Sequence, residues 1–197
     1  MLLSQDEARF PLVPTLRATL GVKGHRPTVG TWDNKDQVYC VAALNVVTGQ
    51  LTTRLLEQPA RSSAKTGQSK QQHLQVAFAA HLRDIARAYP ASAYPEVVIT
   101  IDNAPWHRGA LMEQVLVAHP HLHLKRLPSY SPQLNVIERF WRVLRRRATH
   151  NRLFARMAAL RATLRNNICY FQTMRQKVLS LVESPRKVKK EAKLAAA

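Results

Sequence analysis

The sequence lacks long apolar runs and has few cysteines. No stretch approaches the roughly 20 apolar residues that a membrane span needs, and the first residues have neither the basic segment nor the apolar core of a signal peptide. The two cysteines, Cys40 and Cys169, are too far apart in the sequence to form a metal-ligand spacing. These absences argue against a membrane-spanning protein and a disulfide-rich secreted domain, so we expect a cytoplasmic protein.

Acidic residues are also scarce. The 197 residues include 30 Lys and Arg but only 12 Asp and Glu, which gives a formal net charge of +18. Such an excess indicates a polyanionic partner, either nucleic acid or an anionic membrane surface. A ribosome-like or merely soluble basic protein is the alternative. The length is that of one domain, which can bury a sizeable core without disulfides or metals.

The hydrophobic pattern predicts an α/β fold in which a strand and a hairpin precede alternating helices and strands. The expected strands are 1–10, 37–47, 51–56, 96–101 and 122–127; the expected helices are 69–89, 110–118, 135–149 and 153–182; loops are expected at 11–30 and 61–69. An antiparallel start followed by βαβ units is typical of the RNase H-like fold, a mixed five-stranded sheet flanked by helices. We expect this domain at 1–150, a packed C-terminal helix at 151–183 and a basic, disordered tail at 184–197.

Three acids could lie together in such a fold. Asp102 ends the buried strand 96–101, and ligands of open α/β sheets bind outside the carboxyl ends of the strands. Glu138 lies early in the helix 135–149, beside its apolar face. Asp6 lies near the end of the first strand, which would neighbour strand 96–101 and bring Asp6 close to Asp102.

Each acid also has an explanation that involves no chemistry. Asp102 opens a good turn sequence, DNAP, and Asp6 could be a surface acid at a frayed terminus. Glu138 follows Asn135 by three residues, which is the spacing of a capping box. If the three carboxylates do converge, one or more would take up a proton unless a cation is present, and Mg²⁺ prefers such oxygen ligands. Two Mg²⁺ ions about 3.5–4 Å apart would promote phosphodiester cleavage.

Three segments carry a resemblance to a known family. DEARF at 6–10, DNAPWH at 102–107 and LPSYSPQLNVIERFW at 127–141 closely resemble the DDE catalytic domain of bacterial insertion-sequence transposases allied to the mariner group. The resemblance covers residues 6–147. It implies that Asp6, Asp102 and Glu138 are the catalytic, metal-binding triad, holding two Mg²⁺ ions for which Mn²⁺ can substitute. It also implies nicking of double-stranded DNA at transposon ends, strand transfer into target DNA, and a homodimer on DNA.

The chain departs from the family pattern in two places. The family usually carries an N-terminal helix-turn-helix region, which this sequence does not include, and Val136 replaces the usual proline. We therefore expect an upstream helix-turn-helix protein or domain as a partner. The alternative function is an unproductive, truncated remnant that acts only as a DNA-binding or assembly module. A junction resolvase or an RNase H is a third, weaker interpretation.

Several basic residues are candidates for DNA contact. The helix 135–149 carries a dense arginine surface close to Glu138, for which phosphate contact is favoured over simple solvation. His107, five positions after Asp102, could contact a phosphate or orient water, or could be inert. The candidate DNA-binding residues are Arg17, Arg26, His107, Arg142, Arg145, Arg146 and Arg147. A bacterial protein of this kind would associate with the nucleoid when bound to DNA.

Overall fold

The computed structural model of the protein describes residues 1–31, 33, 35–58, 69–129 and 131–182. Its elements in chain order are β1 (Leu2–Pro11), β2 (Gln37–Asn45), β3 (Leu51–Gln58), α1 (Lys70–Ala88), β4 (Val97–Ile101), α2 (Ala110–Ala118), β5 (Leu122–Arg126), the 3₁₀ turn η1 (Pro132–Leu134), α3 (Ile137–Ala148), α4 (Met157–Thr173) and α5 (Arg175–Val182). The predicted loop at 61–68 and tail at 184–197 lie outside the described residues. No described helix is both long and apolar enough to cross a membrane.

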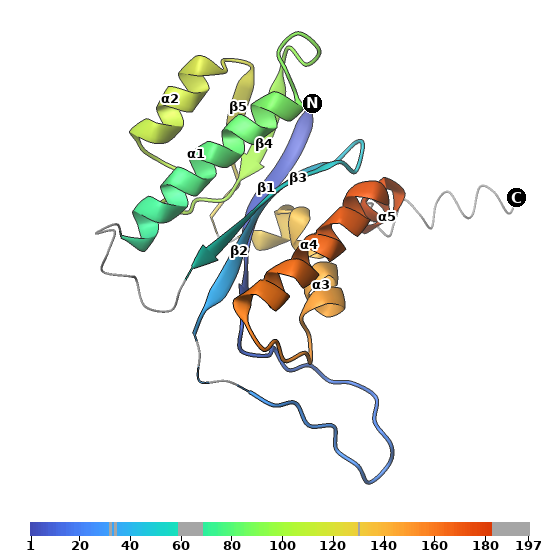
Figure 1. Ribbon diagram of the computed structural model, residues 1–197. Helices are drawn as coiled ribbons and strands as arrows, with labels where there is room; N and C mark the ends of the chain where they lie inside the picture. The colour runs from blue at the N-terminus through green and yellow to red at the C-terminus, as the bar shows by residue number, and fades with distance from the viewer. Residues whose placement is uncertain (32, 34, 59–68, 130, 183–197) are drawn as a thin grey trace, which may run out of the picture.

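The strands form one five-stranded sheet in the order β3-β2-β1-β4-β5. The pairs β1–β2 and β2–β3 are antiparallel, whereas β1–β4 and β4–β5 are parallel. Figure 1 shows the resulting mixed sheet, with β1 at its centre and the chain crossing from β3 through α1 to β4. The first strand and the strand predicted at 96–101 are neighbours in this sheet, as expected.

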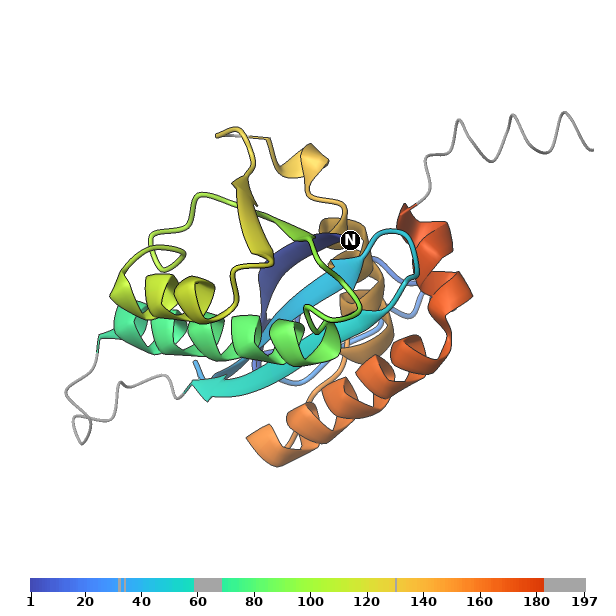
Figure 2. The same cartoon turned by 90° about the horizontal axis from the view of Figure 1, so that it is seen from above.

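Helices cover both faces of the sheet. The helices α1 and α2 lie on one face and α3, α4 and α5 on the other, as Figures 1 and 2 show from two directions. Each face has its own core, one built around α1 and β4 and one around α3, α4 and the alternate residues of β1 and β2. The central strand β1 is therefore buried from both sides, as expected for a strand of a sheet whose two faces are both covered by helices.

The C-terminal stretch differs from the prediction. A single helix was expected at 153–182, but the helix ends at Thr173, the backbone leaves the helical conformation at Met174, and α5 begins at Arg175. The apolar positions explain the break. Leu164, Ile168 and Phe171 are buried at helical spacing, and a straight continuation would place Arg175 on that buried face. The chain turns instead, and α5 buries Val178 against the same core.

Candidate active site

The parallel pairing of β1 with β4 places Asp6 and Asp102 on the same face of the sheet. Leu3 pairs with Ile99 and Ser4 with Thr100, so the same register continued by two residues sets Asp6 opposite Asp102. β4 ends at Ile101, and Asp102 follows it at the point where the chain leaves the sheet. Asp6 is not at a frayed terminus, because it lies inside β1 opposite Ala42 of β2. The fold thus brings the two acids together as predicted.

Glu138 reaches the same place from α3. The helix begins at Ile137, and its N-cap, Val136, makes no side-chain capping bond. The capping-box interpretation is therefore wrong: the Asn135 side chain is buried and its Oδ1 accepts a 2.7 Å hydrogen bond from Ser4 Oγ of β1. This bond ties the start of α3 to the strand that carries Asp6. Glu138 remains exposed, on the side of the helix that faces the acids.

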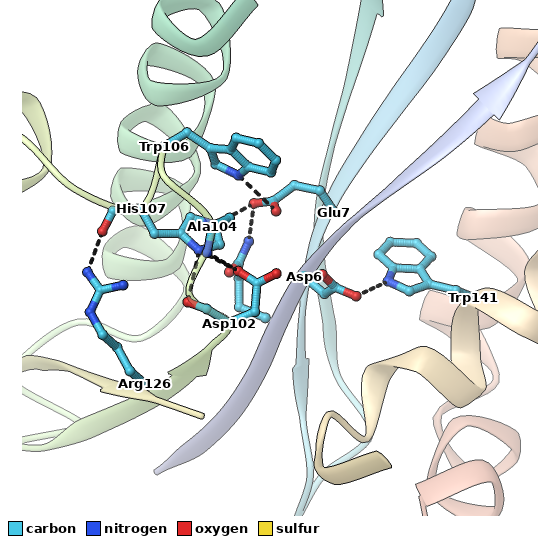
Figure 3. A network of polar contacts seen from close by, with 9 residues as sticks. Asp6, Glu7, Asp102, Ala104, Trp106, His107, Arg126 and Trp141 are labelled. Carbon is cyan, nitrogen blue, oxygen red and sulfur yellow. Dashed lines mark hydrogen bonds and ion pairs between the residues drawn. The ribbon is translucent and has the colours of Figure 1, made fainter. Parts of the chain in front are cut away.

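All three carboxylates line one cavity of about 430 Å³, together with Asn103 and Asn135. Asp6 is the most buried of them, and Trp141 Nε1 of α3 donates a 3.2 Å hydrogen bond to its Oδ2 (Figure 3). Burial and, after it, the negative charges of Glu7, Glu138 and Asp102 raise the pKa of Asp6 from 3.8 to about 8. The three acids are thus too close for all of them to ionise freely, and Asp6 holds a proton at neutral pH unless a cation is present.

Asp102 lies in a contrasting environment. The hydrogen bond from His107 lowers the pKa of this carboxyl, and the Ala104 amide and the charge of Arg126 act in the same direction against partial burial. His107 Nδ1 is 2.9 Å from Asp102 Oδ1, and the backbone N–H of Ala104 donates to the same oxygen at 2.9 Å. The turn predicted after Asp102 is therefore present, and it coexists with the place of Asp102 in the cavity.

Glu7 is the site residue that the sequence analysis missed. Because side chains alternate along a strand, Glu7 points to the face of the sheet opposite Asp6, toward α1 (Figure 3). There its Oε1 accepts a 2.9 Å hydrogen bond from His107 Nε2, and its Oε2 accepts one of 3.2 Å from Trp106 Nε1. The signal in the sequence was the second acid of DEARF, which follows Asp6 inside a strand.

His107 does not lie where a DNA phosphate could reach it. Its side chain is fully buried, and both ring nitrogens contact carboxylates. Burial lowers its pKa, but the hydrogen bonds to Asp102 and Glu7 outweigh burial and raise the pKa to about 9. The prediction of a direct DNA contact is wrong for this residue, because no part of its ring reaches solvent.

The predicted arginines do not share one surface. Arg142 is exposed at a second cavity that also includes Glu138, and Arg146 is exposed one turn further along α3. Arg145 lies over the ring of Phe10, 5.7 Å from its centroid. Arg147 faces α4, where its guanidinium stacks 4.0 Å above Tyr170 and donates to Asn167. The dense arginine surface predicted from the sequence is thus divided among different sides of α3.

Arg17 and Arg26 are exposed on the excursion between β1 and β2. The base of this excursion is fixed to the chain just after α3. The backbone N–H of Arg17 donates to Asn151 Oδ1 at 2.8 Å, and Asn151 Nδ2 donates to the carbonyl of Arg17 at 3.0 Å. Beyond these contacts the excursion extends away from the sheet (Figure 1). The structure therefore leaves both side chains accessible and does not bring them to the carboxylates.

The donor set of the cavity suits a hard divalent cation. Three carboxylates from β1, the end of β4 and α3 offer oxygen ligands, and the pKa of Asp6 is raised by burial and by neighbouring negative charges, which a bound cation would offset. Among the described residues, no three potential ligands lie close enough together to hold a metal ion without moving. Glu138 is exposed, so its side chain can adjust to an ion while Asp6 stays fixed.

Solved structures share this architecture. A pre-cleavage Mos1 transpososome matches with a TM-score of 0.62 and 14% identity over 92% of this chain and 53% of that chain. The Mos1 paired-end complex with the left transposon end matches with a TM-score of 0.59 and 16% identity, over 92% and 54%. The isolated catalytic domain of the Mos1 mariner transposase matches with a TM-score of 0.57 and 13% identity, over 92% and 78%. No curated protein sequence matches the chain.

Strand order, helix placement and these likenesses define an RNase H-like domain with an acidic cavity at the carboxyl ends of its central strands. The chain belongs to the DDE superfamily endonucleases, whose family model matches residues 1–161. It spans about half the length of the complete Mos1 chains and more of the isolated catalytic domain.

Proposed function

We propose that this chain is the catalytic part of a transposase that cleaves DNA at transposon ends and transfers the freed strand into target DNA. The single observation that carries the proposal is the convergence of Asp6, Asp102 and Glu138 on one cavity in a DDE endonuclease fold. Structures of the Mos1 catalytic domain with Mg and with Mn, and of a Mos1 strand transfer complex, support it by analogy of fold.

In this proposal Asp6, Asp102 and Glu138 hold Mg²⁺, or Mn²⁺ in its place. Bound ions would activate a water or 3′-hydroxyl nucleophile and stabilise the leaving oxygen of the phosphodiester. Asp6 supplies a fixed ligand, because the Trp141 indole holds its Oδ2 and β1 holds its backbone. Glu138 supplies a ligand that can approach the ion, since its side chain is exposed at the cavity.

Arg142 is the residue best placed to bind a phosphate next to the reacting one. It is exposed, lies one helical turn after Glu138, and lines the adjoining cavity with it. Arg146, Arg17 and Arg26 add exposed positive charge at greater distance. Such contacts fix the DNA on the surface without reading its sequence.

Recognition of the ends requires more than this surface. We propose that a helix-turn-helix region, on this or another chain, reads the terminal repeats, and that the protein works as a homodimer on the DNA of a bacterial nucleoid. The complete Mos1 chains, of which this chain spans about half, leave room for such a region. The domain boundary near residue 150, with the helices after it as an extension, also stays a prediction.

The test is metal-dependent nicking of supercoiled plasmid DNA by the purified 197-residue chain. Asp102→Asn and Glu138→Gln should reduce nicking by at least about 10²-fold while DNA binding without metal persists. Glu113→Gln, which removes an acid of α2 outside the cavity, is the matched control and should nick normally. Full nicking by both site variants would contradict the assignment.

Two further outcomes separate the alternatives. A chain that binds DNA but never cleaves it, with either Mg²⁺ or Mn²⁺, would be the unproductive binding module. A chain that cleaves four-way junctions or RNA–DNA hybrids in strong preference to plasmid DNA would be a resolvase or an RNase H.

A further inference from the structure

The contacts of His107 join two carboxylates from different parts of the sheet, since Glu7 lies in β1 and Asp102 follows β4. Its Nδ1 donates to Asp102 Oδ1 and its Nε2 donates to Glu7 Oε1, each at 2.9 Å (Figure 3). The ring is fully buried and packs against Phe78 of α1, with 4.3 Å between the ring centroids. The backbone is held as well, because Arg126 Nη2 donates to the His107 carbonyl at 2.7 Å.

These contacts divide the two oxygens of Asp102 between different tasks. Both hydrogen bonds to the carboxylate, from His107 Nδ1 and from the Ala104 amide, end on Oδ1. No hydrogen bond within the described part of the chain reaches Oδ2, and the side chain is 48% exposed at the cavity. Figure 3 shows that the second oxygen lies on the side of Asp6. Asp102 is therefore held as a ligand with one oxygen available.

Glu7 makes this arrangement compatible with a cation. With both nitrogens donating, the ring carries a positive charge, which alone would oppose a metal ion bound at Asp102. The carboxylate of Glu7 offsets that charge from the far side of the ring. Glu7 cannot turn away, because Trp106 Nε1 donates to its Oε2 and Gln5 Nε2 donates to its Oε1 at 2.8 Å.

We propose that His107, clamped by Glu7, is a positioning residue that fixes the Asp102 carboxylate so that its second oxygen binds a divalent cation. This inference rests on the proposed function, because it assigns His107 a task only if Asp102 is a metal ligand. Residues behind metal ligands commonly orient them in this way, and their loss typically weakens metal binding by about 10–100-fold. The competing role is packing alone, in which His107 supports the fold without affecting metal affinity.

The experiment compares His107→Phe, which keeps an aromatic ring against Phe78 but removes both donors, with His107→Gln, which keeps one amide donor. Mn²⁺ binding to the purified chain is measured by electron paramagnetic resonance, and nicking is measured against Mn²⁺ concentration. His107→Phe should weaken Mn²⁺ binding by about 10–100-fold and raise the Mn²⁺ concentration for half-maximal nicking by a similar factor. DNA affinity without metal should not change. His107→Gln should recover part of the loss.

His81→Phe is the matched control, since His81 is another fully buried histidine on the α1 face and its ring makes no hydrogen bond to Asp102 or Glu7. It should leave Mn²⁺ affinity as in the wild type. Unchanged Mn²⁺ affinity in both His107 variants would overturn the proposal, whatever their thermal stability, and if only the glutamine variant folds, its Mn²⁺ affinity decides. A wild-type chain that neither binds Mn²⁺ nor nicks DNA would instead refute the proposed function.

Discussion

Replacement of Asp6 by asparagine should stabilise the metal-free protein. The carboxyl is 7% exposed, lies among the negative charges of Glu7, Glu138 and Asp102, and has a pKa raised to about 8, chiefly by burial. Asparagine has nearly the same shape and keeps an oxygen that can accept the hydrogen bond from Trp141 Nε1. Asp6→Asn thus removes the buried charge and little else.

The size of the effect follows from linkage between protonation and folding. Asp6 titrates at about 3.8 in the unfolded chain and at about 8 in the folded one, so the folded state holds this proton across the interval between them. The contribution of Asp6 to stability is complete below about pH 4 and is lost as the pH rises through about 8. The upper limit of that loss is about 5–6 kcal/mol. Because the carboxyl lines a cavity that admits water, we expect Asp6→Asn to raise the unfolding free energy by about 1–3 kcal/mol near pH 8.

The assay is urea denaturation at about pH 5 and about pH 8, each with EDTA and with saturating Mg²⁺. The wild type should lose more stability than Asp6→Asn between the two pH values, and Mg²⁺ should stabilise the wild type far more than the variant. Asp84→Asn is the control: its carboxylate is paired with Arg54 and Arg87, so the change should destabilise the fold and leave the Mg²⁺ response intact. A variant less stable than the wild type in EDTA at pH 8 would refute the reasoning, as would an undiminished Mg²⁺ response.

Three further predictions concern stability and DNA binding. The ring nitrogens of His81 are buried without a hydrogen-bond partner in the described residues, and burial lowers the pKa of His81 to about 4, so the wild type should lose stability as the pH falls from about 6.5 to 4. In urea denaturation, His81→Leu should remove that loss, which is up to about 3 kcal/mol, and an equal acid sensitivity in both proteins would contradict this. Asn135→Ala leaves the buried hydroxyl of Ser4 without an acceptor and should lower the unfolding free energy by about 1–3 kcal/mol. Adding Ser4→Ala should recover part of that loss, and strictly additive losses would argue against the hydrogen bond. Arg142→Ala should lower the salt dependence of DNA affinity by the equivalent of about one phosphate contact. The Arg147 side chain faces α4, so Arg147→Ala should lower stability and leave the salt dependence unchanged, and binding titrations at several salt concentrations distinguish the two variants.

The sequence was sufficient to predict the parts of the site that follow from topology. A three-strand antiparallel start followed by βαβ units is typical of the RNase H-like fold, in which the first and fourth strands are parallel neighbours, as they are here. Asp6 and Asp102 then meet because each lies at a definable position along its strand. Glu138 was predicted from its place early in a helix beside an apolar face, and this face does pack on β1 through Phe140, Trp141 and Leu144.

The sequence could not predict the contacts that depend on which way a side chain points. On a strand with one buried face, alternating apolar residues show which way each side chain points, but β1 is buried on both faces. Gln5 and Asp6 are both buried, so the pattern gave no indication that Glu7 faces α1 and His107. A local capping box was the alternative explanation for the spacing of Asn135 and Glu138, but the Asn135 side chain bonds to Ser4, 131 residues earlier in the chain. A tertiary contact of this kind overrides a local motif that costs little to abandon.

The consecutive acids of β1 illustrate how one strand can bury two carboxylates. Both cost free energy when removed from water, and strand alternation sends them to opposite faces of the sheet. Glu7 meets His107 and Trp106, so its charge is compensated within the chain itself. Asp6 meets an indole N–H and further carboxylates, so it keeps a proton up to about pH 8 unless a cation from solution binds in place of that proton. The fold therefore retains at Asp6 an electrostatic cost that a divalent cation can relieve, and relief of that cost contributes to the affinity of the site for the ion.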